Sequence, residues 1–186
     1  MTDFTIHTID TAPERAGAGL RAAQQKLGFI PNMMAVLAES PAALEGYQAV
    51  QGALATSSLS TAEQHFLALA ISVDNGCTYC VPVYSMLAAK SGVPRQAVDA
   101  LRDGQPIDDG RLSALRDFTQ AVVEKRGRVA DEQVKAFLDA GFTKAQVLEV
   151  ILAAAFKLIS NYTNHVADIP LDEAFQAHRW DGRKAA

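Results

Sequence analysis

Residues 59–80 read LSTAEQHFLALAISVDNGCTYC and hold both the clearest helix signal and the two cysteines of the chain. Ser60 and Glu63 have the spacing of a capping box, which starts a helix. A long apolar run follows, and the triplet Asp-Asn-Gly predicts where this helix ends. We therefore expect one buried helix that leads directly into Cys77 and Cys80.

The whole chain has helical character. Its 186 residues are 49% hydrophobic, which is enough for one sizeable core, and alanine is the commonest residue. Apolar residues recur at intervals of three and four, whereas strand-like alternation is almost absent. These patterns predict an all-α protein, a single domain over residues 1–186 built as a bundle of about eight helices.

Local signals predict where the other helices begin and end. Ser40 and Pro41 suit the N-cap and the first position of a helix, and glycines suit helix ends. The segment 104–110, with a proline and two glycines, is the most linker-like stretch. Further helices are expected near 11–26, after 31, and near 41–55, 94–103, 111–125, 131–140 and 143–164. The last of these has apolar residues on one stripe: Val147, Val150, Ile151, Ala154 and Leu158.

Composition and charge exclude several classes of partner. The 17 basic and 21 acidic residues leave a net charge of −4, so no broad positive surface awaits nucleic acid or an anionic membrane. The longest apolar stretches, near 66–73 and 150–156, fall short of the roughly 20 residues of a membrane-spanning helix. The N-terminus lacks the features of a secretory signal. We expect a cytoplasmic protein.

Cys77 and Cys80 form a C-x-x-C pair. Two thiols three positions apart on a helix face the same side and can form a reversible disulfide, and a helix N-terminus favours the thiolate. Pro82 leaves two arrangements open, because the helix either includes the cysteines or restarts at the proline and leaves them in a turn.

The pair has two other interpretations. A free cysteine is often a small buried apolar residue, and a C-x-x-C can be half of a zinc site. A second C-x-x-C is absent, and the histidines show no pair with zinc-ligand spacing: His7, His65, His165 and His178. The sequence therefore favours a redox pair without a metal or other cofactor over structural thiols or a metal site.

The pattern LSxxE…NGCxYC resembles the core of the carboxymuconolactone decarboxylase and alkyl hydroperoxidase D family. The resemblance is strongest over Leu59–Val98 within a family core of about 45–125, and the flanks at 28–32 and near His165 are similar to its peroxidase-related members. It implies an all-α fold of the alkyl hydroperoxidase D-like type. It also implies a homo-oligomer, as a dimer, trimer or hexamer.

The resemblance assigns roles to four positions. The family pattern is E-x11-C-x2-C-x3-H, which implies that Cys80 attacks the peroxide and that Cys77 resolves the sulfenate into a disulfide. His65 stands where the family has glutamate, and Tyr84 stands where it has the proton-relaying histidine. A tyrosine is a poor base at neutral pH, so we expect His65 to supply the base beside Tyr84. Replacing His65 with alanine should then slow thiol oxidation strongly.

The predicted function is a thiol-dependent peroxidase or disulfide oxidoreductase with an antioxidant role. It would reduce organic hydroperoxides and be re-reduced by an external dithiol. The alternatives are a lactone decarboxylase, which does not need a thiol pair, and a non-catalytic oligomer that senses redox state or binds a ligand.

Two other groups of residues are candidates for the site. Asn161 and His165 share a face of the last helix and could line the site opposite the cysteines, although a histidine also suits a helix C-terminus. Three methionines could be core residues or walls of a pocket for an organic peroxide: Met33, Met34 and Met86.

Overall fold

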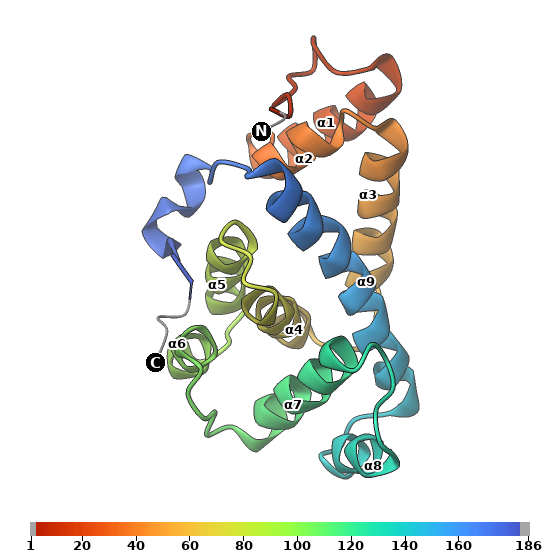
Figure 1. Ribbon diagram of the computed structural model, residues 1–186, viewed down its shortest axis with the longest axis vertical. Coiled ribbons are helices and arrows are strands. Elements are labelled where there is room, and N and C mark those ends of the chain that lie inside the picture. The colour runs from red at the N-terminus through yellow and green to blue at the C-terminus, as the bar shows by residue number, and fades with distance from the viewer. Residues whose placement is uncertain (1–2, 183–186) are drawn as a thin grey trace.

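The computed structural model describes residues 3–182, and these residues form helices and loops without a strand (Figure 1). The α-helices are α1 (Glu14–Leu27), α2 (Asn32–Leu37), α3 (Pro41–Ala55), α4 (Thr61–Asp74), α5 (Cys80–Lys90), α6 (Arg95–Asp103), α7 (Gly110–Glu124), α8 (Asp131–Asp139) and α9 (Lys144–Ala167). A 3-10 helix, η1 (Glu173–His178), follows. The all-α prediction is confirmed, and the short α2 and η1 bring the total slightly above the expected number.

The local signals set most helix ends as predicted. Ser60 and Glu63 form the capping box at the start of α4, and the Ser40 side chain caps α3 ahead of Pro41. Gly28 ends α1 in the left-handed conformation with φ 82°. These short-range hydrogen bonds explain why the helix boundaries could be found from sequence.

Helix α4 lies at the centre of the molecule, and its residues 66–73 are all buried (Figure 1). It packs against α3, α5, α7 and α9, while α3 and α9 run side by side along one edge. Helices α1 and α2 cover one end of this arrangement and α7 and α8 the other, and η1 lies beside α5. The junction of α4 and α5, where the cysteines lie, is therefore inside the fold.

The loop 104–110 does not separate two cores. The hydrophobic core joins residues from both sides of it, from Ala16 to Trp180. The single domain over 1–186 stays a prediction, and its ends at 1–2 and 183–186 lie outside the described residues.

The stripe predicted for the last helix is wrong in part. Val150 is fully buried, but Ile151 and Leu158 are 47% and 50% exposed. The inward side of α9 carries polar residues instead: Lys157, Ser160, Asn161 and Asn164. By length and composition α9 is the one helix among residues 3–182 that could cross a membrane, yet it packs against α2, α3, α4 and α7 as a core helix does.

Candidate active site

A tight turn carries the chain from α4 into the cysteines. Gly76 has φ 66°, which a side chain would disfavour, and its N–H donates to the carbonyl of Val73 at 3.0 Å. The N–H of Cys77 donates to the carbonyl of Ser72 at 2.9 Å, which completes a Schellman motif. Cys77 therefore lies in the turn.

Cys80 is the first residue of α5, so the structure divides the pair between a turn and a helix. Pro82 falls in the first helical turn, where its missing N–H breaks no helix bond. The backbone N–H of Cys80 donates to Cys77 Sγ at 3.3 Å. The Cys80 sulfur thus lies at a helix N-terminus, where the dipole favours a negative charge.

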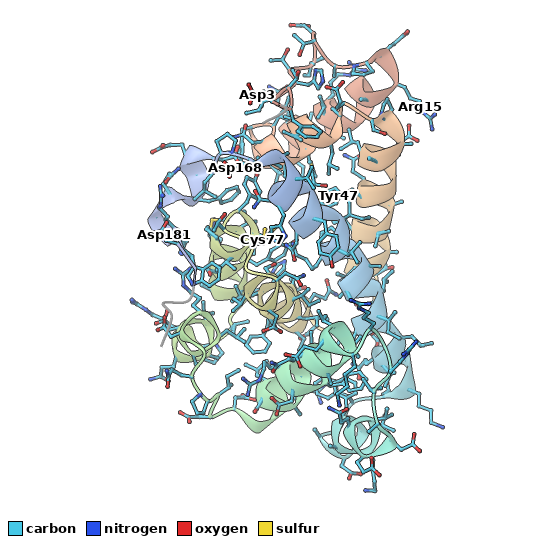
Figure 2. All side chains as sticks on the ribbon, in the orientation of Figure 1. Asp3, Arg15, Tyr47, Cys77, Asp168 and Asp181 are labelled. Atoms are coloured by element: carbon cyan, nitrogen blue, oxygen red, sulfur yellow. The ribbon has the colours of Figure 1, made fainter. Side chains whose placement is uncertain are left out.

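Both cysteines are free thiols inside the molecule (Figure 2). Cys77 is 0% exposed and Cys80 is 3% exposed. A cavity of about 370 Å³ reaches Cys80, and Cys77 is absent from its described lining. The cavity walls are mostly aromatic and aliphatic: Leu27, Phe29, Pro31, Met33, Met34, Tyr47, Gln51, Tyr79, Val83, Tyr84, Met86, Leu87, Lys90, Lys157, Ser160, Ala174 and Phe175. A molecule that enters the cavity meets Cys80 first.

Lys157 of α9 brings a positive charge to Cys80. Its side chain is 0% exposed, and Nζ donates to Ser160 Oγ at 2.9 Å. Nζ also lies 4.2 Å from the centre of the Tyr84 ring and 5.3 Å from that of Phe156, in cation–π geometry. A lysine buried this deeply needs an anionic partner, and the Cys80 thiolate is that partner.

The two thiols ionise differently. Burial opposes the charge on Cys80, but hydrogen bonds from Cys77, Ser160 and Lys157 and the charge of Lys157 outweigh it and lower the pKa to about 5. The pKa of Cys77 is raised, chiefly because its thiol donates to Cys80 and is buried beside that charge. At neutral pH the pair is therefore a Cys80 thiolate that accepts a hydrogen bond from the Cys77 thiol.

Tyr84 and His65 lie beside each other, but only Tyr84 faces the cavity. Their ring centroids are 6.3 Å apart, and burial raises the pKa of Tyr84 well above its ordinary value. His65 is half-buried, and its Nδ1 lies 3.1 Å from Ser91 Oγ. Burial lowers the pKa of His65, and its described contacts include neither cysteine. The structure brings Cys77, Cys80 and Tyr84 together and leaves His65 behind Tyr84.

Tyr79, between the cysteines, ties the turn to two distant segments. Its hydroxyl donates to Asp172 Oδ2 at 2.5 Å and accepts from the N–H of Met33 at 3.3 Å. Asp172 also accepts from the N–H of Asn32 at 3.1 Å, at the start of α2. These bonds fix the cavity wall on the side of α2 and η1.

The other candidates on α9 fall outside the cavity. Asn161 is fully buried and accepts from Asn75 Nδ2 at 3.0 Å, behind the turn. His165 is exposed, beside the Tyr162 ring. Met33, Met34 and Met86 do line the cavity. Within residues 3–182 no group of three or more His, Cys, Asp or Glu side chains could hold a metal ion.

Sequence reasoning missed Lys157 and Tyr47. The stretch Ala-Phe-Lys-Leu-Ile places a lysine within the apolar part of the last helix, and this was the available signal for Lys157. Tyr47 of α3 lines the cavity and had no motif around it.

Comparison with known proteins agrees with the fold and with the C-x-x-C turn. The family model of the carboxymuconolactone decarboxylase family matches residues 41–121, from α3 to α7, and includes both cysteines. This segment belongs to that family, as the resemblance implied. No curated protein matches the chain in sequence.

Solved structures share the complete fold. An uncharacterized peroxidase-related protein from Ralstonia eutropha, described as an alkylhydroperoxidase AhpD core, has a TM-score of 0.83 and 22% identity over 92% of this chain and 93% of its own. A peroxidase-related protein from Silicibacter sp. has a TM-score of 0.78 and 18% identity over 98% and 94%.

A debrominase shares the fold as well. A cysteine-to-alanine variant of Bmp8, solved in complex with 2,3,4-tribromopyrrole, has a TM-score of 0.78 and 21% identity over 96% of each chain. The alkyl hydroperoxidase D-like fold is thus confirmed, and proteins of different described activities adopt it.

Proposed function

We propose that this protein is a thiol peroxidase that reduces organic hydroperoxides with the Cys77–Cys80 pair. The observation that carries the proposal is the Cys80 thiolate, which lies beside the buried Lys157 and opens onto a largely apolar cavity of about 370 Å³. A thiolate is the nucleophile that a peroxide requires, and a cavity of this size suits a small organic molecule.

The reaction takes two steps. The Cys80 thiolate attacks the terminal oxygen of the hydroperoxide, the O–O bond breaks, and the products after protonation are a Cys80 sulfenic acid and an alcohol. The Cys77 sulfur, having lost its proton, then attacks the Cys80 sulfur, and a disulfide and water result. An external dithiol returns both cysteines to the reduced state.

The test is the reaction of the reduced protein with a small excess of cumene hydroperoxide at neutral pH. We expect loss of two thiols and of two hydrogens in mass, much faster than free cysteine reacts, and repeated turnover with a dithiol. Cys80→Ser should not react, whereas Cys77→Ser should stop at a sulfenic acid. Oxidation no faster than that of free cysteine would contradict the peroxidase.

The role of His65 as a base stays a prediction, and its position restricts how it could act. His65 lies against Tyr84, so any effect on Cys80 has to pass through that tyrosine. His65→Ala should then slow oxidation in the wild-type background and have no further effect in Tyr84→Phe. Equal effects in both backgrounds would mean that His65 acts independently of Tyr84.

Reductive dehalogenation of a small aromatic compound is a second candidate. Aromatic side chains in the cavity wall favour a flat ring: Phe29, Tyr47, Tyr79, Tyr84 and Phe175. The Cys80 thiolate would take the halogen from the ring, a proton would replace it, and Cys77 would displace halide to form the disulfide. Release of bromide from a brominated pyrrole, with loss of two thiols, would support this reaction. Lactone decarboxylation and pure redox sensing use no hydroperoxide turnover.

We also propose a homo-oligomer that forms through the outward side of α9. Its exposed residues from 148 to 162 are all uncharged: Leu148, Ile151, Ala155, Leu158 and Tyr162. Two hollows of about 410 and 500 Å³ flank this ridge, and Leu158 and Tyr162 line both. A second copy carries the same ridge and the same hollows, so the face is suited to self-association. A cytoplasmic location stays a prediction.

A further inference from the structure

The tyrosine hydroxyls around Cys80 are not equivalent. Tyr47, Tyr79 and Tyr84 all line the cavity that reaches Cys80. The Tyr79 hydroxyl has two hydrogen-bond partners, Asp172 and the backbone of Met33. The hydroxyls of Tyr47 and Tyr84 have no hydrogen-bond partner among residues 3–182, although each residue is only 7% exposed.

Packing holds the two unpartnered tyrosines in place. The Tyr47 ring stacks on Phe156 with centroids 5.1 Å apart, and the Tyr84 ring meets the same phenylalanine edge-on at 6.5 Å. Lys157 Nζ covers the Tyr84 ring. These contacts come from α3, α5 and α9, so neither phenol depends on its hydroxyl for its position.

A buried hydroxyl without a partner costs folding free energy, and such a group in a cavity is available to a ligand. Burial raises the pKa of both phenols, and the Cys80 charge raises it further. Both therefore stay protonated at physiological pH and act as hydrogen-bond donors close to the thiolate.

We propose that Tyr47 is a catalytic residue that, together with Tyr84, donates hydrogen bonds to the oxygen that leaves when Cys80 attacks a hydroperoxide. This inference rests on the proposed peroxidase function. The new bond joins Cys80 Sγ to the terminal oxygen, and the O–O bond breaks with its electron pair on the alkoxide. The alkoxide takes a proton from a phenol and becomes the alcohol, and water in the cavity returns the proton to the phenolate. The donor pair thus meets the charge where it develops.

The test compares three reagents on Tyr47→Phe, Tyr84→Phe and the double variant. With cumene hydroperoxide, whose leaving alkoxide is strongly basic, we expect about a tenfold slower oxidation of Cys80 in each single variant and about 100-fold in the double. A peroxy acid releases a weakly basic carboxylate, and iodoacetamide releases iodide, so neither needs a proton donor. Both should react with the variants at the wild-type rate.

Tyr79→Phe is the matched control, since its hydroxyl has protein partners. It should lower the melting temperature, whereas Tyr47→Phe and Tyr84→Phe should not. A wild-type rate for the double variant with cumene hydroperoxide would overturn the inference and leave the peroxidase standing. Equal slowing with all three reagents would also overturn it, by assigning the hydroxyls to the thiolate or to structure. A slow wild-type protein would contradict the peroxidase and, with it, the inference.

Discussion

The two sides of α9 reverse the usual relation between polarity and burial. The inward side holds Lys157 and Asn161, both 0% exposed, whereas the outward side holds Leu148 and Val166 at 67% and 72%. Burying a charge and exposing aliphatic side chains both cost free energy in an isolated chain. The inward cost is offset by the Cys80 thiolate, and on our proposal a second copy offsets the outward cost. One helix thus serves the chemistry on one side and association on the other.

The largest expected effect comes from the inward side. Lys157→Met keeps the length of the side chain and removes the charge that lowers the pKa of Cys80. If that pKa rises to the ordinary thiol range or above, the thiolate fraction at neutral pH falls, and alkylation by iodoacetamide should slow by about 30-fold or more. The control is Lys144→Met, an exposed lysine at the start of the same helix, which should react like wild type. An unchanged rate in Lys157→Met would remove the lysine from the site.

The outward side should respond in its state of association. Leu158→Lys places a charge in the middle of the apolar ridge, at a residue that lines both hollows. We expect about a 30-fold weaker self-association, the size of an interface hot spot, with thiol reactivity retained. Light scattering after gel filtration measures it. Leu148→Lys, which borders neither hollow, should leave the oligomer nearly intact, and a monomeric wild-type protein would refute the interface.

The pH dependence tests the ion pair without a mutation. Because the pKa of folded Cys80 is lowered to about 5, alkylation should be half-maximal near that pH and level at neutral pH. One pH unit below this pKa the thiolate is reduced to about a tenth, and the rate should fall with it. The reduced protein should also lose stability as the pH falls from the ordinary thiol pKa through about 5, because the unfolded thiol binds the proton more tightly. Cys80→Ser should abolish both effects, and a midpoint near the ordinary thiol range would contradict the assignment.

The smallest effect is expected at Ser160. Ser160→Ala removes one hydrogen bond to the thiolate and leaves the charge of Lys157 in place. We expect the alkylation midpoint to move up by less than one pH unit, and the neutral-pH rate to change by less than about threefold. A loss as large as that of Lys157→Met would mean that Ser160 is required to position the lysine.

Most of the scaffold could be predicted from sequence, and part of the site could. The capping box at Ser60 and the glycine turn at Gly76 depend on neighbours within a few residues, so their patterns were sufficient. The same holds for the placement of Cys77 and Cys80 at a helix start. His65 and Tyr84 were found by comparison with a family pattern, and the structure separates them with respect to the cavity.

The composition and local patterns of this chain are enough to specify an all-α protein with a thiol pair at the junction of two helices, because helix caps and glycine turns are short-range interactions. The identity of the attacking sulfur, its charged neighbour Lys157 and the phenol of Tyr47 depend on how α3, α5 and α9 meet. Periodicity assigns a helix an apolar side but cannot tell which side turns inward when a buried anion stabilises a lysine there. The ion pair exists only in the packed molecule, where low dielectric and fixed geometry make it strong.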